Sequence, residues 1–326
     1  MKAIAWITYG PPDALQFQEM EKPVPKDDEI LVKIYAASAN PLDWHRMRAA
    51  PFLVRLGEGL RKPGDPRLGA DMAGQVEAVG SNVTQFQPGD EVFGMCNGTF
   101  AEYVCASTET VATKPANATF EQAAAVPVAA FTALQGLRKG QIQSGQQVLV
   151  NGASGGVGTF AVQIARSFGA EVTGVCSTRN LEMVRSIGAD HAIDYTQEDF
   201  TRNGQRYDLI YDAVGNRSVA DYKRALKPQG ICVIAGFSSI GRMIEHAVLG
   251  PWMSRNGKKK IGPMGMAKAD QQDLIFVKEL IEAGKVVPVI DRRYPLPETA
   301  AAIRYLEEGH AQGKVVITVD GLSHDS

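Results

Sequence analysis

A glycine-rich segment that follows an apolar run is the strongest sign of chemistry in this chain. Residues 148–158 read Val-Leu-Val-Asn-Gly-Ala-Ser-Gly-Gly-Val-Gly, and a segment with helical spacing follows directly. A strand, a tight turn and a helix in this order can hold a phosphate group, because the helix start offers unpaired N–H groups and glycines allow a close approach. The spacing G-x-x-G-G-x-G departs from the regular G-x-G-x-x-G. The residues predicted to contact a dinucleotide here are Gly152, Ser154, Gly155, Gly156, Val157 and Gly158. A glycine-rich connection without a ligand is the alternative.

The end of the next predicted strand indicates which dinucleotide is bound. The strand at 170–176 runs into residues 177–180, Ser-Thr-Arg-Asn. A site for NAD usually has Asp or Glu at this point, which accepts hydrogen bonds from the adenosine ribose. The acid on this strand, Glu171, lies at its opposite end, whereas hydroxyl and guanidinium groups suit a 2′-phosphate. We therefore predict NADPH as the cofactor, with Ser177 and Arg179 at the 2′-phosphate. The alternative is that Arg179 is an ordinary surface residue at a helix start.

Alternating elements around the glycine turn predict an α/β fold with a doubly wound parallel sheet. The predicted strands lie at 147–151, 170–176, 190–194, 208–213 and 231–236, and the predicted helices at 157–168, 179–187 and 217–226. These strands are apolar throughout, as expected when helices cover both faces of a sheet. Their carboxyl ends should pass beneath the dinucleotide, which adds Val214, Gly236 and Phe237 to the predicted cofactor site.

Two segments flank this predicted sheet. Thr119 and Gln122 predict the start of a helix over 120–137, which Pro127 should break or kink. Within it, Thr132 is predicted to donate a hydrogen bond to phosphate or nicotinamide. Regular alternation fails over 238–266, where five glycines and two prolines occur. We predict a solvated loop at Lys258-Lys259-Lys260, and a lid over a hydrophobic substrate formed by the apolar residues Val248, Leu249 and Trp252.

The first third of the chain has a different pattern. Short alternating runs are separated by turn signals such as Pro11-Pro12 and Pro88-Gly89-Asp90, which predicts a small, partly open β-barrel. After a helix at 271–283, strands at 286–290 and 314–319 flank a helix at 297–308 and suit this first domain. The predicted domains are therefore 1–121 with 265–326, and 122–264.

Composition restricts the classes of function. The chain has 326 residues, 44% of them hydrophobic, and a formal net charge of −2, which argues against nucleic acid as the main partner. The four cysteines form no C-x-x-C pair, so they fit buried thiols better than a disulfide framework. Neither a signal peptide nor an apolar stretch of membrane-spanning length is evident, which predicts a cytoplasmic protein.

Several motifs together resemble the medium-chain dehydrogenase/reductase superfamily over nearly the whole chain. They lie at 69–80, 86–92, 151–158 and 313–317. The resemblance implies a Rossmann sheet plus a GroES-like domain. The chain departs from the zinc alcohol dehydrogenases in three places. Their Gly-His-Glu is replaced by Gly69-Ala70-Asp71. Their cysteine is absent from the segment Ser38-Ala39-Asn40-Pro41. Their lobe with four cysteines is missing. His45, Asp71, Cys96 and Cys105 are too scattered to predict a zinc site, and no metal is expected.

Without these zinc ligands, the chain resembles the zinc-free quinone oxidoreductase branch of the superfamily. Residues 40–44, Asn-Pro-Leu-Asp-Trp, and 189–195 resemble segments of that branch, nearest to reticulon-interacting oxidoreductases and plant alkenal/enone reductases. The resemblance implies hydride transfer from NADPH to a quinone or an α,β-unsaturated carbonyl compound, with Tyr195 at the adenosine phosphate. It also implies a homodimer.

On the barrel side, we predict Asn40, Asp43 and His45 as catalytic residues. His45 is the group in this segment that titrates near neutral pH, so it is the candidate proton donor. Asp43 could instead cap a helix, and His45 could face solvent. Two other functions stay open, namely an NADPH-binding interaction protein without robust turnover and an enoyl-thioester reductase.

Overall fold

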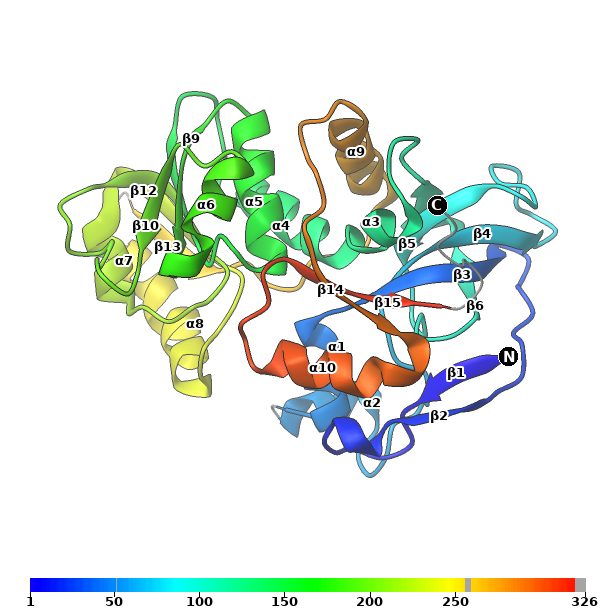
Figure 1. The fold of residues 1–326 in the computed structure, drawn as a ribbon. Coiled ribbons are helices and arrows are strands. Elements are labelled where there is room, and N and C mark those ends of the chain that lie inside the picture. The colour runs from blue at the N-terminus through cyan, green and yellow to red at the C-terminus, as the bar shows by residue number, and fades with distance from the viewer. Residues whose placement is uncertain (51, 256–258, 320–326) are drawn as a thin grey trace. The chain divides into compact units, whose positions relative to one another are not determined.

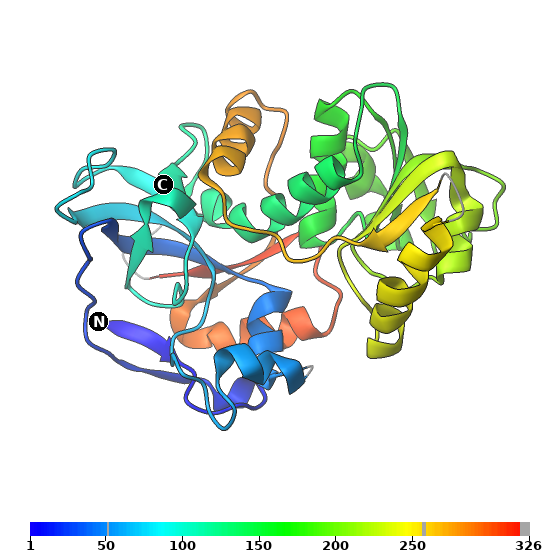
Figure 2. The same ribbon diagram turned by 180° about the vertical axis from the view of Figure 1, so that it is seen from behind.

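The computed structural model describes residues 1–50, 52–255 and 259–319, and the chain forms two compact units. The first comprises Met1–Ala129, Ala269–Ala283 and Pro288–Ser326, and the second comprises Ala130–Lys268 and Gly284–Val287. Each unit has a sheet and a hydrophobic core of its own. Figures 1 and 2 show the elements of both units.

The first unit contains a mostly antiparallel sheet of seven short or bent strands. In spatial order they are β14 (Ile290–Pro295), β15 (Lys314–Thr318), β3 (Glu29–Ala39), β4 (Asp71–Val79), β5 (Glu91–Met95) and β7 (Val111–Thr113), and β6 (Tyr103–Ser107) also pairs with β3. A separate hairpin joins β1 (Lys2–Ala5) and β2 (Gln16–Glu19). Because β15 pairs with β3, the last described strand of the chain lies in the sheet of the first third.

Helices and buried side chains complete this unit. The helices are α1 (Pro41–Arg48), α2 (Arg55–Glu58), α3 (Phe120–Ala124), α9 (Gln271–Glu282) and α10 (Thr299–Glu307), with 3₁₀ turns at Pro12–Ala14, Phe52–Val54, Thr108–Thr110 and Leu296–Glu298. The predicted capping pair Thr119 and Gln122 starts α3, each side chain accepting from the other residue's backbone N–H. Trp6, Met72 and Phe100 are fully buried in the core.

The predicted strand at 286–290 is wrong, because β14 begins only at Ile290. The backbone of Val287 is satisfied by a side chain instead of a neighbouring strand. Its N–H donates to Oε1 of Gln163 at 2.8 Å, and its carbonyl accepts from Nε2 of Gln163 at 3.1 Å. Pro288 follows and has no N–H to give to a ladder. The strand therefore starts two residues beyond this proline.

The second unit is built on a six-stranded parallel sheet, which confirms the predicted doubly wound arrangement. Its order is β10 (His191–Asp194), β9 (Glu171–Cys176), β8 (Gln147–Asn151), β11 (Tyr207–Asp212), β12 (Leu226–Ile234) and β13 (Lys260–Pro263). The connections are α4 (Pro127–Lys139), α5 (Gly156–Ser167), a 3₁₀ turn at Thr178–Asn180, α6 (Leu181–Ser186), α7 (Val219–Ala225) and α8 (Ile240–Arg255). Helices α4, α5 and α6 lie on one side of the sheet and α7 and α8 on the other (Figures 1 and 2). The strand order reverses at β8, where such sheets bind ligands.

One expected break in a helix is confirmed, and one segment expected to be irregular is corrected. The helix predicted over 120–137 is divided at Pro127 into α3 and α4, as predicted. Most of the described residues of segment 238–266 are regular, because they form α8 and β13, and the glycines and prolines of the segment obscure its helical spacing in the sequence. Val248, Leu249 and Trp252 therefore belong to α8, and the side chain of Trp252 lies outside the described part of the chain.

The expected solvated lysine loop is also corrected. The ammonium group of Lys259 donates to the carbonyls of Lys223 at 2.6 Å and Leu226 at 2.7 Å, where α7 ends. It thus satisfies backbone acceptors that the helix end leaves without partners. Lys260 begins β13, and Lys258 lies outside the described residues.

Candidate functional site

The glycine turn brings its backbone close to the start of α5. Gly152 has a φ of 82°, and a Cβ atom on Gly158 would lie 2.0 Å from the Gly152 carbonyl oxygen. The N–H groups of Gly152 and Ala153 both donate to the carbonyl of Val175, which fixes the turn to β9. Gly155 is the N-cap of α5, a helix of 12 residues that begins at Gly156. The turn is therefore a narrow cradle at a helix amino end, and its chemistry fits a dinucleotide pyrophosphate.

The structure links this turn to the segment predicted to bind a 2′-phosphate. Asn180 is buried, and its Nδ2 atom donates to Ser154 Oγ at 3.0 Å and to Ser177 Oγ at 3.2 Å. Arg179 is the middle residue of the 3₁₀ turn that connects Ser177 with Asn180. Our sequence analysis named both serines but missed the asparagine that joins them. The sequence did offer a signal, because Asn180 follows Ser177, a predicted phosphate ligand, by three residues.

An acidic residue that our sequence analysis overlooked lies at the same edge. Asp194 ends β10 and stands opposite Cys176, the last residue of β9. Its carboxylate accepts hydrogen bonds from Thr178 Oγ1 at 2.5 Å and Thr196 Oγ1 at 2.8 Å, and the hydrogen bond from Thr178 is the main one that keeps its pKa below the usual range. A carboxylate of the neighbouring strand thus lies beside the end of β9, where the sequence of β9 itself has no acid, and next to the exposed Tyr195.

The ends of β11 and β12 meet at the carboxyl edge of the sheet. Asp212, the last residue of β11, is fully buried and accepts from the N–H groups of Val214 and Gly215, both at 2.7 Å. The side chains of Asn151 and Tyr222 donate to its other oxygen at 3.0 and 2.6 Å. One carboxylate therefore holds the turn after β11 through two hydrogen bonds and connects it to β8 and α7 through two more.

The turn after β12 packs directly against this one. A Cβ atom on Gly215 would lie 2.2 Å from the carbonyl oxygen of Gly236, and Ser238 Oγ donates to the Gly215 carbonyl at 3.1 Å. Phe237 is 38% exposed beside this contact. Val214, Gly236 and Phe237, which we predicted from separate strands, are thus brought together.

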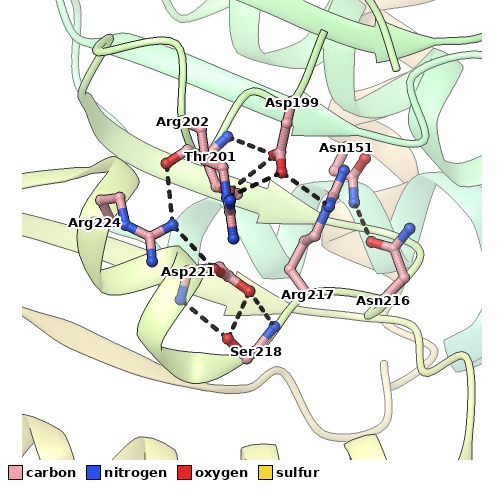
Figure 3. A network of polar contacts seen from close by, with 9 residues as sticks. All are labelled: Asn151, Asp199, Thr201, Arg202, Asn216, Arg217, Ser218, Asp221 and Arg224. Atoms are coloured by element: carbon pink, nitrogen blue, oxygen red, sulfur yellow. Dashed lines mark hydrogen bonds and ion pairs between the residues drawn. The ribbon is translucent and has the colours of Figure 1, made fainter. Parts of the chain in front are cut away.

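A polar network supports the loop that follows (Figure 3). Arg217 is held by Asp199 at 3.3 Å, and Asn216 accepts from Asn151 at 3.2 Å. The same network includes Thr201, Arg202, Ser218, Asp221 and Arg224. It fixes the segment between β11 and α7 by side chains from the loop after β10 and from the end of β8. Thr132, which we predicted to bind the cofactor, lies on α4, and its carbonyl accepts a hydrogen bond from the Tyr211 hydroxyl at 3.0 Å. This contact connects α4 to β11.

The first unit contains a buried polar cluster around Asp71. Its carboxylate accepts from Ser38 Oγ at 2.7 Å, from Asn40 Nδ2 at 2.9 Å and from the N–H of Val128 at 2.8 Å. The ammonium of Lys314 lies 3.3 Å from Asp71 and 2.5 Å from Asn40 Oδ1. Both ends of the Asn40 amide are thus engaged inside the unit. Our sequence analysis missed Lys314, although one lysine at the start of an apolar strand was a signal for a buried charge.

The other two predicted catalytic residues lie on α1. Asp43 Oδ2 accepts from the N–H of Asn40 at 2.8 Å and so caps the helix, whereas Oδ1 is buried with no partner in the described structure. Burial raises the pKa of Asp43 to about 7. The ring of His45 stacks on Trp44 with centroids 3.6 Å apart, and its Nδ1 lies 2.8 Å from the Ala50 carbonyl oxygen. Burial lowers the pKa of His45, so the ring is neutral near pH 7.

Asp43 should make the stability of the first unit depend on pH. Since its pKa in the folded state lies above the ordinary value of 3.8, the folded chain binds the extra proton between about pH 4 and 7. The free energy of unfolding should therefore fall as pH rises through this window, by at most about 1.4 kcal/mol per pH unit. Asp43→Asn cannot ionise, yet its amide oxygen can still accept from Asn40, so its stability should be flatter. Urea unfolding of both proteins from about pH 4 to 8 measures the difference, and parallel curves would contradict this assignment.

The chemistry of the cluster around Asp71 does not suit a metal. Lys314 supplies a positive charge and three hydrogen-bond donors but no lone pair for coordination. In the described part of the chain, no three or more His, Cys, Asp or Glu side chains are grouped to hold a metal ion. Similarly, no described helix combines the length and hydropathy that a membrane span requires.

Comparison with known proteins defines the class. Residues 26–116 match the alcohol dehydrogenase GroES-like domain, and residues 187–317 match a zinc-binding dehydrogenase domain. The chain belongs to the medium-chain dehydrogenase/reductase superfamily, which confirms the resemblance seen in the sequence.

Individual relatives are reductases. The chain is 36% identical to 2-methylene-furan-3-one reductase of Solanum lycopersicum and 35% identical to the chloroplastic NADPH-dependent alkenal/one oxidoreductase of Arabidopsis thaliana. Each alignment covers 97% of this chain and 79% of the relative. The quinone oxidoreductase structure from Coxiella burnetii superposes with a TM-score of 0.86 at 31% identity, over 98% of this chain and 99% of the other. The chain is thus an NAD(P)H-dependent oxidoreductase among quinone and enone reductases.

Proposed function

We propose that this protein uses NADPH to reduce a quinone or an α,β-unsaturated carbonyl compound. The observation that carries the proposal is the joined pair of Ser154 and Ser177, which puts hydroxyl groups both at the glycine cradle and at the end of β9. The second of these positions is where a 2′-phosphate distinguishes NADPH from NADH. The names of the plant relatives, an alkenal/one oxidoreductase and a furanone reductase, support the acceptor class.

Each part of the second unit has a proposed role toward this cofactor. The start of α5 and the glycine turn hold the pyrophosphate, while Ser177, Arg179 and Tyr195 hold the 2′-phosphate. Thr132, Val214, Gly236 and Phe237 position the nicotinamide half. When bound, the reduced nicotinamide supplies the hydride. Extended conjugation makes the acceptor's negative charge easier to stabilise than that of a simple alkoxide, so a metal is not required.

In the first unit, we propose His45 as the group that exchanges a proton with water. With Nδ1–H donated to Ala50, the neutral ring carries its lone pair on Nε2, and this is the atom at which we propose that the proton is exchanged. Asn40 and Asp43 act through the start of α1, because their side chains are engaged in its cap and in the Asp71 cluster. A homodimer and a cytoplasmic location remain predictions.

An acceptor panel tests the proposed function. Oxidation of NADPH, followed by absorbance, should occur with naphthoquinones, phenanthrenequinone or short enals and enones, and only weakly with simple ketones. Activity should survive incubation with a chelator. Binding of NADPH without turnover on the whole panel would favour a cofactor-binding interaction protein, and selective turnover of enoyl thioesters would favour an enoyl-thioester reductase.

Arg179→Ala should weaken NADPH binding by roughly 1.5–3 kcal/mol, the usual value of a charge-assisted hydrogen bond. NADH has no 2′-phosphate, so its affinity should change little. Titration of the purified protein with each nucleotide measures both effects. Unchanged affinity for NADPH would remove Arg179 from the proposed site.

A further inference from the structure

The side chain of Asn180 bridges two hydroxyl groups that belong to different strand ends. Ser154 lies in the turn after β8, and Ser177 follows β9, the neighbouring strand. Asn180 is 4% exposed, and its Nδ2 lies 3.0 Å from Ser154 Oγ and 3.2 Å from Ser177 Oγ. One amide group therefore fixes the distance between two positions of the proposed cofactor site.

The direction of these hydrogen bonds determines what the serines can do. An amide nitrogen carries two hydrogens, so Asn180 can donate to both hydroxyls at once. Each serine oxygen then acts as an acceptor toward Asn180, and its own single hydrogen remains to be donated elsewhere. Phosphate oxygens at neutral pH are strong acceptors. Asn180 thus holds the two serine oxygens in place and makes each of these otherwise rotatable hydroxyl groups a hydrogen-bond donor.

The other end of the amide points to a role beyond packing. Asn180 Oδ1 is buried and has no hydrogen-bond partner among the described residues. A buried polar atom without a partner reduces stability, and such atoms are rare in folded proteins. A small apolar side chain would avoid this cost. An asparagine here is therefore better explained by what its nitrogen does for the two serines than by stability.

We infer that Asn180 is a positioning residue that makes Ser154 and Ser177 phosphate donors and thereby strengthens selection of NADPH over NADH. The inference rests on the proposed function, since it takes Ser177 to lie at the 2′-phosphate. Ser154 serves the pyrophosphate, which both cofactors have. Loss of Asn180 should therefore weaken binding of both nucleotides, and of NADPH more strongly.

Three variants test this role through binding of NADPH and NADH without substrate. Asn180→Ala releases both hydroxyls and should weaken NADPH roughly tenfold to 100-fold and NADH roughly threefold. Asn180→Asp keeps the size but offers only acceptors, so it should draw the serine hydrogens inward and weaken NADPH further. In the Ser177→Ala background, Asn180→Ala should lower NADPH affinity only to the extent that it lowers NADH affinity. Titration by calorimetry gives the dissociation constants, and thermal unfolding gives the stability.

The outcomes separate this inference from the proposed function. A wild-type protein that binds NADPH and NADH equally would overturn the proposed cofactor choice and the inference with it. If the wild type prefers NADPH but Asn180→Ala keeps that preference unchanged, only the inference fails. Lower thermal stability of Asn180→Ala with unaltered binding would likewise assign Asn180 to structure alone.

Discussion

Replacing Gly158 with alanine should strongly weaken dinucleotide binding. A Cβ atom at this position would lie 2.0 Å from the carbonyl oxygen of Gly152 and 2.9 Å from the Cα of Ala153. These are backbone atoms, so no side-chain rotation relieves the clash, and either the turn or α5 must move. We expect a loss of roughly 100-fold in NADPH affinity, because a shift of about 1 Å in a positioning element has effects of this size. Strain in a packed region should also lower the free energy of unfolding by about 1–3 kcal/mol.

Gly262 provides a matched control in the same unit. It lies in β13 and does not adopt a left-handed conformation. A Cβ atom at this position would have no heavy atom within 4 Å among the described residues, apart from those of its chain neighbours. Gly262→Ala should therefore leave NADPH affinity unchanged and alter the stability by less than about 0.5 kcal/mol. Titration with NADPH and urea unfolding compare the two variants. Wild-type affinity in Gly158→Ala would show that the cofactor does not use this cradle.

The second unit was largely predictable from the chain because its sheet is parallel. Both faces of such a sheet are covered, so each strand appears as an apolar run separated from the next by a helix. The strand at 147–151 was predicted to the residue, and those at 170–176 and 208–213 to within one residue at each end. The glycine turn was identified because φ values above zero and close backbone approach restrict the residue type.

Contacts between distant side chains could not be predicted in the same way. Lys314 and Asp71 are 243 residues apart in sequence, and only the pairing of β15 and β4 with β3 brings them together. Asp194 was missed for a similar reason, since a carboxylate at the end of β10 lies beside the end of β9 only through strand order. Local periodicity carries no information about which strand ends become neighbours.

The buried pair of Lys314 and Asp71 should be the main electrostatic support of the first unit. Lys314 is 3% exposed, and its ammonium contacts Asn40 Oδ1 and Asp71 Oδ2. Lys314→Met keeps much of the side-chain volume but leaves the Asp71 carboxylate buried without a cation. Removal of one partner from a buried ion pair lowers stability by about 3–5 kcal/mol. Urea unfolding should show a loss of this size, whereas Lys26→Met, at a lysine whose side chain is 84% exposed, should change stability by less than about 0.5 kcal/mol.

A second substitution distinguishes lost charge pairing from lost packing. If the cost of Lys314→Met arises from the uncompensated carboxylate, adding Asp71→Asn should restore about 1–3 kcal/mol, because the neutral amide no longer needs a cation. The oxygen of the introduced amide could take the place of Oδ1 and accept from the N–H of Val128, while its Nδ2 could donate to Ser38 Oγ. A double variant that is less stable than Lys314→Met alone would mean that the lysine acts through packing. In that case, the positive charge beside Asp71 would not be what holds β3, β4, β15 and the start of α4 together.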